Sequence, residues 1–560
     1  MKPSRYLVLT TLLTLIVFLP GNALAQSGKS KPTPAVAPAK DPNALDLEMI
    51  SVIRREGLKN SKVMDWISGL TDGIGPRLTN SPNQKRANQW VKEQLEKMGL
   101  ENVHFEAWGP FGRGWSYEIS HVRMVSPDVA ELIALPKAWS RGTEGPVRGK
   151  VVHTVIKTKE DFEKYRGKLQ GAIVLNGEMR VLKPWNEPKS ERYDEKGLNE
   201  LVQYPLDGDR YAFYTPQYRA QLLAMSRAMT KFFEDEGALA VIDPSRTFDG
   251  GTIAVQGNGS AYKKDEPVGL PALVMSIEQF GRITRLVDAK KDVELELDVK
   301  TTFYENNGDM FGYNVVGEIP GTDLKDEVVI LGGHLDSWHG ATGATDDAAG
   351  VGAVMEAMRI LKATGAKPRR TVRVIAWTGE EEGLLGSRGY VAEHYAERPK
   401  DPNAKPDDKP LPWNLKPDWD KVSVYFNLDN GTGKVRGVFL QDNLSVAPIF
   451  EKWMVPFKDL GMTTLVTRGD PGSDHVSFDD AGIPAFQFVQ DDIEYDTRTH
   501  HTNMDTLERI QKEDMVQAAT IIAAFAYQAA MRDERLPRRP LPPQDVAPKA
   551  EPKPEDAKKK

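Results

Sequence analysis

The sequence predicts an α/β fold: a mixed, largely parallel sheet flanked by helices, with a β-rich domain inserted into it. From about residue 314 to 531, apolar runs alternate with amphipathic helical segments, which is typical of parallel strands joined by helices. From about residue 126 to 299, short apolar runs are divided by Gly, Pro and Asp, which indicates β-structure with a few helices. The length of 560 residues exceeds the roughly 250–300 at which one hydrophobic core stops growing, so several domains are expected.

Four predicted strands lie in the α/β part, and each ends at a cluster of polar residues. They cover residues 328–331, 372–376, 422–426 and 485–489. In open α/β sheets, ligands bind beyond the carboxyl ends of the strands. The polar clusters are therefore the candidate site.

The region of about residues 47–110 has a helical period. The segment Asn88–Gly99 is an amphipathic helix by this pattern, and Gly99 supplies its C-terminal cap. This region is predicted to be the N-terminal segment of the α/β domain.

The first 25 residues have the pattern of a signal peptide. Lys2 and Arg5 form a charged start, residues 6–20 are apolar, and Ala23-Leu24-Ala25 has the form of a cleavage site. The apolar run is shorter than the ~20 residues that a membrane-spanning helix needs. We expect cleavage before Gln26, export to the periplasm or the medium, and no stable membrane anchor after cleavage.

The domain boundaries follow from these changes in composition. Segments rich in Lys, Pro and Ala have few large apolar side chains to bury, so folding them would not offset the loss of conformational entropy. These segments are predicted to be a linker and a tail. A Pro-rich stretch from Pro399 to Pro417 is predicted to be a surface loop that could border a pocket. The prediction is a signal peptide at 1–25, a flexible linker at 26–46, the N-terminal segment of the main domain at 47–125, the β-rich insertion at 126–299, the catalytic part at 300–535 and a disordered tail at 536–560.

Charge and cysteine content exclude several classes of function. The formal charge of -7 comes from acidic and basic residues mixed along the chain, so no long basic stripe can follow a phosphate backbone, and no nucleic-acid partner is expected. The absence of cysteine excludes disulfides, thiolate zinc sites, a cysteine nucleophile and a lipid attached to cysteine. Any metal must be held by histidine and carboxylate.

The strand ends carry such ligands. Zinc binds imidazole and carboxylate when thiolates are absent, and a two-zinc site with ions about 3.5–4 Å apart needs a bridging carboxylate, terminal ligands on both sides and a further carboxylate as base. Each element alone could be structural: a hydrogen-bonded histidine, a helix cap or a solvated helix start. Their occurrence at successive strand ends favours a metal site. The clusters are His334-Leu335-Asp336, residues 343–350 with Asp346 and Asp347, residues 378–383 with Glu380 to Glu382, residues 427–430 with Asp429, and residues 500–505 with His500 and His501.

In order along the chain, these residues resemble the signature of metallopeptidase family 28, whose members are zinc exopeptidases. The matching pattern is His-x-Asp, Asp-Asp-x-x-Gly, Glu-Glu, Asp and His-[Ser/Thr]-x-x-Asp-Thr. The resemblance implies the zinc exopeptidase fold, two Zn²⁺ per chain and peptide substrates. It also implies roles: His334 and His501 as terminal ligands of the two zinc ions, Asp346 as the bridge, Glu381 and Asp429 as terminal ligands on opposite metals, Glu380 as the general base, and Asp336 as the carboxylate that orients His334.

The resemblance extends over about residues 47–530. Residues 73–78 resemble the amino-terminal segment of the family, and the β-rich insertion resembles a protease-associated domain. The run Gly333–Trp338, the phrase Pro368–Thr371 and the doubled histidine are most similar to carboxypeptidase Q-like members. In contrast, Gly472-Ser473-Asp474-His475 is closer to the aminopeptidase branch, so aminopeptidase and carboxypeptidase Q-like dipeptidase activity both stay open.

Two other functions occur on similar scaffolds. One is a single-zinc enzyme similar to glutaminyl cyclase, and the other is a non-catalytic, receptor-like binding protein. Retention of all the expected ligand types favours the peptidase. No His-Glu-x-x-His, Gly-x-Ser-x-Gly or P-loop pattern occurs.

The remaining histidines are assigned by their context. His501 is preferred over His500 because it alone precedes Thr-x-x-Asp-Thr, and His339 and His394 are expected at the surface. Asp474 and His475 line a pocket or form a structural turn. The insertion is expected to supply no metal ligand, because its histidine, His153, stands outside any ligand pattern. A second copy of the chain, as in a homodimer, stays open as a partner.

Overall fold

The structure is a computed structural model that describes residues 45–186, 188–203, 216–246, 249–305, 308–399 and 411–540. The predicted signal peptide lies outside the described residues. Nearly all of the predicted linker, most of the predicted tail and the middle of the Pro-rich loop lie outside them as well.

An eight-stranded mixed sheet forms the centre of the main domain. Its strand order is β1-β10-β12-β11-β15-β18-β16-β17. The strands are β1 (Glu101–Trp108), β10 (Gly312–Ile319), β11 (Leu324–His334), β12 (Arg370–Trp377), β15 (Val422–Asn427), β16 (Val435–Phe439), β17 (Thr464–Val466) and β18 (Ala485–Gln490). A separate two-stranded sheet pairs β13 (Ala396–Glu397) with β14 (Asn414–Leu415).

The four predicted strands are confirmed as β11, β12, β15 and β18. They are neighbours in the sheet, and β12, β11, β15 and β18 pair in parallel in that order. Their carboxyl ends therefore meet at one edge of the sheet. The predicted α/β class, with a mixed and largely parallel centre, is also confirmed.

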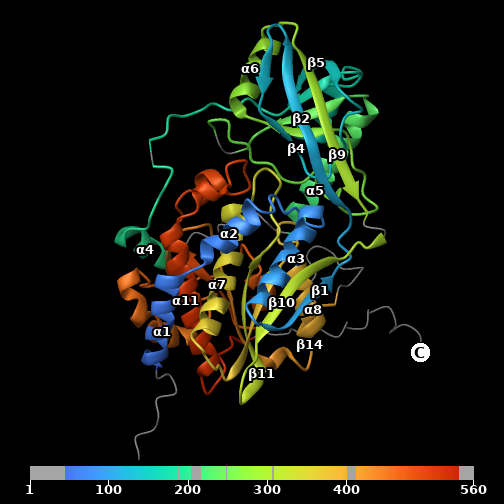
Figure 1. Cartoon of the computed structure of the whole chain (residues 1–560). Helices are drawn as coiled ribbons and strands as arrows, with labels where there is room; N and C mark the ends of the chain where they lie inside the picture. The colour runs from blue at the N-terminus through green and yellow to red at the C-terminus, as the bar shows by residue number, and fades with distance from the viewer. Residues whose placement is uncertain are drawn as a thin grey trace, which may run out of the picture. The chain divides into compact units, whose positions relative to one another are not determined.

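Helices cover both faces of this sheet, because its central strands are apolar on both sides. In β11, Val329 and Leu331 belong to the core beneath one layer of helices, whereas Val328 and Ile330 belong to the core on the opposite face. Figure 1 shows α1, α2, α7 and α11 gathered beside the sheet. The first layer comprises α1 (Leu47–Asn60), α2 (Val63–Thr71), α3 (Pro82–Lys97), α7 (Ala349–Ala363), α9 (Ala447–Met454) and α11 (Lys512–Met531), and the second comprises α8 (Leu385–His394) and α10 (His475–Asp480).

Helix α3 covers residues 88–97 of the helix predicted at residues 88–99. Ser81 caps its start by accepting a hydrogen bond from the backbone N–H of Gln84 at 3.1 Å, and Pro82 occupies the first turn, where no backbone donor is needed. Gly99 follows the helix with φ of 75°, as expected for a C-terminal glycine cap.

A second eight-stranded sheet forms the β-rich region. Its order is β3-β2-β9-β5-β6-β7-β8-β4, and β2 and β9 pair antiparallel from Gly114↔Tyr304 to Ser126↔Glu294 (Figure 1). The sheet therefore spans residues 114–304 and extends beyond the predicted 126–299 at both ends. Its elements are β2 (Gly114–Ser126), β3 (Ala130–Leu132), β4 (Ala134–Pro136), β5 (Val147–Thr154), β6 (Ile173–Asn176), β7 (Ala240–Pro244), β8 (Ala272–Met275), β9 (Glu294–Tyr304), α4 (Glu195–Val202), α5 (Pro216–Asp235) and α6 (Ile277–Asp288).

The chain beyond α11 stays packed further than composition predicts. Leu536 is buried, and the guanidinium of Arg538 donates hydrogen bonds to the backbone oxygens of Trp419 and Val422, both at 2.8 Å. The predicted start of the tail at residue 536 is thus too early, because these long-range contacts compensate for the polar composition. Among the described residues, no helix is long and apolar enough to cross a membrane.

Candidate metal centre

The predicted ligands meet at the edge where the four parallel strands end. His334 is the last residue of β11, Asp346 lies in the kinked segment Ala344–Ala348 before α7, and Asp429 follows β15. Glu381 follows β12, and His501 lies in the loop after β18. The parallel topology thus brings together residues that are up to 167 positions apart, from 334 to 501.

Asp346 stands between the two histidines. Its Oδ1 lies 3.1 Å from Nε2 of His334, and its Oδ2 lies 3.3 Å from Nε2 of His501. A carboxylate that presents one oxygen to each of two imidazoles has the geometry of a bridging ligand.

Each histidine also faces a further carboxylate. Oδ1 of Asp429 lies 3.5 Å from Nε2 of His334, and Oε2 of Glu381 lies 3.0 Å from Nε2 of His501. Oε2 of Glu380 is 4.0 Å from Nε2 of His334, so it approaches the cluster without joining either set closely. The residues therefore sort into two sets that share Asp346: one with His334 and Asp429, the other with His501 and Glu381.

The chemistry of this cluster fits bound cations. Oδ2 of Asp346, Oε1 of Glu381 and Oδ1 of Asp429 are buried without a hydrogen-bond partner among the described residues. Burial, reinforced by neighbouring carboxylates such as Asp346, raises the pKa of Glu381 well above its usual range. Buried anions that lack donors need cations to offset their desolvation. Groups whose possible ligand atoms all lie within 4.8 Å of one another include Asp346 with His500 and His501, His334 with Asp347 and Asp429, and His334 with Asp346 and Glu381.

Asp336 supports His334, but mainly through its backbone. Nδ1 of His334 is 3.0 Å from the carbonyl oxygen of Asp336 and 3.7 Å from its Oδ1. The carboxylate oxygen Oδ2 accepts hydrogen bonds from the hydroxyl of Thr79 at 3.1 Å and from the backbone N–H of Glu381 at 3.2 Å. Asp336 thus orients the imidazole with its carbonyl and holds the Glu381 loop with its carboxylate.

Asp347, next to Asp346 in the chain, has a structural role. Its Oδ1 accepts from the backbone N–H of Gly350 at 2.7 Å, and its Oδ2 accepts from that of His334 at 3.1 Å. A side chain at Gly350 would not fit, because a Cβ there would lie 2.0 Å from the backbone oxygen of Leu428. This close approach explains the glycine of the Asp-Asp-x-x-Gly pattern.

Two buried residues that support the loops were not assigned from the sequence. Oδ1 of Asp505 accepts from the backbone N–H of Thr345 at 2.6 Å, and its Oδ2 accepts from that of Asp346 at 3.1 Å. The fully buried guanidinium of Arg77 donates to the carbonyl oxygens of Leu335 at 2.7 Å, Thr342 at 2.6 Å and Gly343 at 2.8 Å. Arg77 and Asp505 both lie within segments that resemble the metallopeptidase family. This resemblance was the feature of the sequence from which their importance could have been predicted.

The second member of the histidine pair lies farther from the bridge. Nε2 of His500 is 3.9 Å from Oδ2 of Asp346, compared with 3.3 Å for His501, and its ring stacks on Tyr495 with centroids 4.7 Å apart. His501 is thus the nearer of the two histidines to Asp346.

The expectation that His339 lies at the surface is wrong. Its side chain is buried against Trp115 and Tyr117, and its Nε2 donates to the carbonyl oxygen of Pro136 at 2.7 Å. His339 is buried because its ring packs against the second sheet, a contact that the local sequence does not indicate. His394, in contrast, is partly exposed and pairs with Glu106 at 3.1 Å.

Asp474 and His475 are both fully buried. Nε2 of His475 donates to the carbonyl oxygen of Asp470 at 2.7 Å, which is a structural contact within the turn. Both carboxylate oxygens of Asp474 lack a hydrogen-bond partner among the described residues, and burial raises its pKa to about 7. His153 donates to the carbonyl oxygen of Gly177 at 2.8 Å and does not join the metal cluster.

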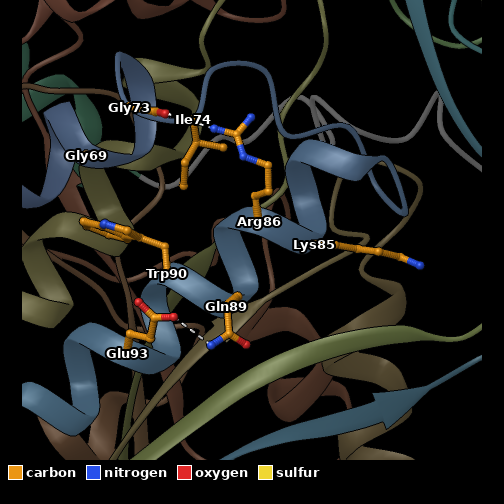
Figure 2. Close-up of a pocket in the computed structure, with 8 residues that line it drawn as sticks. All are labelled: Gly69, Gly73, Ile74, Lys85, Arg86, Gln89, Trp90 and Glu93. Carbon is orange, nitrogen blue, oxygen red and sulfur yellow. Dashed lines mark hydrogen bonds between the residues drawn. The ribbon is translucent and has the colours of Figure 1, made fainter.

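A cavity of about 510 Å³ lies between the end of α2 and the first turns of α3. Figure 2 shows Trp90 and Ile74 on its wall, with Arg86 bonded to the carbonyl oxygen of Gly73 and Gln89 bonded to Glu93. None of the residues that line it belongs to the metal cluster, so this cavity is separate from the candidate centre.

Comparisons with known proteins identify similar chains and folds. Residues 314–526 match the model of Peptidase family M28. Carboxypeptidase Q of Mus musculus is 26% identical over 471 residues, which cover 84% of this chain and 86% of that protein. Among solved structures, a peptidase M28 precursor from Shewanella amazonensis has a TM-score of 0.61 at 24% identity, covering 89% of this chain and 98% of its own. A zinc aminopeptidase from Bacillus subtilis has a TM-score of 0.52 at 20% identity, covering 84% and 95%.

Fold, clustered ligands and these matches define the class: the chain is a metallopeptidase, a hydrolase of peptide bonds. Its residues 314–526 belong to peptidase family M28.

Proposed function

We propose that the chain is an exported exopeptidase that binds two zinc ions and removes residues from the ends of peptides or cleaves dipeptides. The observation that carries this proposal is the position of Asp346, whose two oxygens face His334 and His501 separately. Relatives that are named carboxypeptidase and aminopeptidase support action at a peptide end.

His334, Asp346 and Asp429 would hold one ion, and His501, Asp346 and Glu381 the other. Zinc bound there would supply Lewis acidity, which lowers the pKa of water and polarises a scissile carbonyl. A single-zinc enzyme would use only one of the two sets, and a receptor-like binding protein would use neither. Both alternatives therefore leave buried histidine and carboxylate ligands without a metal.

Glu380 is the group that moves the proton. Its carboxylate lies beside the cluster, 4.0 Å from Nε2 of His334, and its side chain is 11% exposed. Burial raises its pKa well above the usual range, and the carboxylates of Asp429 and Glu381 add to this effect. Such a carboxylate can take a proton from the attacking water and return it to the leaving amine.

The second sheet, at residues 114–304, would act as a protease-associated-like domain that shapes access to the centre. The N-terminal pattern of charged, apolar and small residues supports export, and the site for cleavage is before Gln26. Detection of a mature chain that begins at Gln26 in the periplasm or medium would test this part.

The test of the activity is a panel of unblocked, amino-blocked and carboxyl-blocked dipeptides. An exopeptidase that recognises one free end should cleave one blocked class and not the other, whereas a dipeptidase that needs both free ends should cleave only the unblocked dipeptides. The Glu380→Gln variant, purified in the same way, controls for contaminating peptidases. Equal cleavage of both blocked classes, or of internal bonds in longer peptides, would contradict an exopeptidase.

A further inference from the structure

The inserted domain contacts the loop that carries His501. The backbone N–H of Asn503 donates to the carbonyl oxygen of Ile253 at 3.1 Å, and the N–H of Val255 donates to that of His501 at 3.2 Å. The side chain of Asn503 accepts a further bond from the N–H of Ile253 at 2.7 Å. This antiparallel contact, with a bridge between Ala254 and Thr502, aligns the two segments.

A second inserted segment holds the same loop nearer to β18. Glu191 and Ile493 exchange two backbone hydrogen bonds of 2.8 Å, and the guanidinium of Arg192 lies 3.2 Å from the buried carboxylate of Asp491. The loop between β18 and α11 is thus attached to the insertion at two places, one before and one at His501.

At the centre of this contact, Gln256 reaches the ring of His501. Its amide nitrogen is 2.9 Å from Nδ1, while Nε2 on the other side of the ring faces Glu381 and Asp346. His501 has φ of 59°, which is uncommon for a residue with a side chain and indicates that its surroundings impose its conformation. Gln256 also lines a cavity of about 340 Å³.

We propose that Gln256, supplied by the inserted domain, is a positioning residue that orients His501 for metal binding. An imidazole that binds metal through Nε2 carries its proton on Nδ1, and a hydrogen-bond acceptor there sets the tautomer and the ring orientation. With the amide nitrogen at Nδ1, the ring accepts there and carries its proton on Nε2. Rotation of the amide by about 180° presents its oxygen to Nδ1–H instead, which is the arrangement that metal binding through Nε2 requires. The insertion, which supplies no ligand, thereby controls one side of the centre.

The inference rests on the proposed two-zinc function, and it is tested by zinc affinity. Competition with a chelator, on variants whose folding is checked by circular dichroism and thermal unfolding, gives the dissociation constant of each ion. The Gln256→Met variant keeps the size of the side chain and removes the hydrogen bond. Its dissociation constant for one of the two zinc ions should rise by about 10–100-fold. The Gln256→Glu variant keeps an acceptor for Nδ1–H and should bind zinc about as tightly as the natural protein.

Gln279→Met is the matched control. Gln279 also lies in the insertion and bonds to the backbone of Ile133 and of Glu131 in β3, but it does not contact the metal cluster. Its replacement should leave zinc affinity unchanged. Should Gln256→Met fail to fold, Gln256→Asn, whose amide is too short to reach Nδ1, should show the same loss.

Equal zinc affinity in the folded Gln256→Met variant, or in Gln256→Asn where it replaces that variant, would overturn the inference. Loss of affinity in Gln256→Glu as large as in Gln256→Met would overturn it too, because the residue would then act by shape alone. Failure of the natural protein to bind zinc would instead contradict the proposed function.

Discussion

Glu380 and Glu381 are adjacent and chemically identical, yet their carboxylates have different surroundings. Oε2 of Glu381 lies 3.0 Å from Nε2 of His501 within the metal cluster, whereas Oε2 of Glu380 is no closer than 4.0 Å to Nε2 of His334. These distances are those expected if Glu381 is a ligand and Glu380 the base, as proposed above. This difference can be tested separately at each position.

Replacing Glu380→Gln should abolish most turnover while metal content stays near two. The amide keeps the size and hydrogen bonding of the side chain but cannot accept the proton, so kcat should fall by about 10²–10⁴. Steady-state kinetics together with metal analysis of the purified variant would measure both. A Glu380→Gln variant that loses zinc would show that Glu380 is a ligand.

Replacing Glu381→Gln should instead lower metal affinity, because a neutral amide coordinates zinc weakly. Activity should be partly restored by added zinc, as measured in a zinc titration beside the Glu380→Gln control, which zinc should not rescue. Retention of tight zinc binding in Glu381→Gln would contradict its placement in the cluster.

At the scale of elements, the loop after β11 connects the centre to the second sheet. His339 lies in this loop, with its ring against Trp115 and Tyr117 of β2 and its Nε2 bonded to Pro136 of β4. Burial lowers the pKa of His339 from its ordinary value of 6.5 to about 4. The loop is therefore held best when this imidazole is neutral.

This burial predicts a pH-dependent loss of stability. Above pH 6.5 the ring is neutral in both states, and between pH 6.5 and 4 only the unfolded chain takes up the proton, so the contribution of His339 is lost as the pH falls. From pH 7 to 5 the loss is about 2 kcal/mol, since each pKa unit corresponds to about 1.4 kcal/mol. Urea unfolding of the metal-free protein at both pH values would measure it.

The His339→Phe variant is the control for this effect, because it keeps an aromatic ring and removes the titration. Between pH 7 and 5, the free energy of unfolding of this variant should fall by about 2 kcal/mol less than that of the natural protein. An identical pH dependence in both proteins would show that His339 titrates normally in the fold.

At the scale of the whole molecule, metal binding should stabilise the fold, because the ligands come from four strand ends and from loops far apart in sequence. A ligand that binds only the folded state adds about 2.7 kcal/mol at a free concentration 100 times its Kd. Chelation should therefore lower Tm, remove about two zinc ions per chain and abolish activity, and zinc should restore all three. Metal analysis that finds one tightly bound ion in a fully active preparation would contradict the two-metal centre.

The amino-acid sequence by itself determined the α/β class, the four central strands and the types of ligand at their ends. These features are local: apolar runs predict strands, and a ligand that directly follows a strand must lie at the sheet edge where that strand ends. The candidate ligands His334, Glu381 and Asp429 follow from this placement, whereas Asp346 and His501 lie farther along the loops and are identified with the help of the family resemblance.

Only the tertiary structure decided how these groups pair and what supports them. The division of the two oxygens of Asp346 between His334 and His501, the contact of Gln256 with His501, and the burial of His339 each join residues that have no periodic relation in the chain. Burial and hydrogen bonding depend on what lies opposite a side chain in space, and sequence patterns encode only which face of its own element a residue occupies.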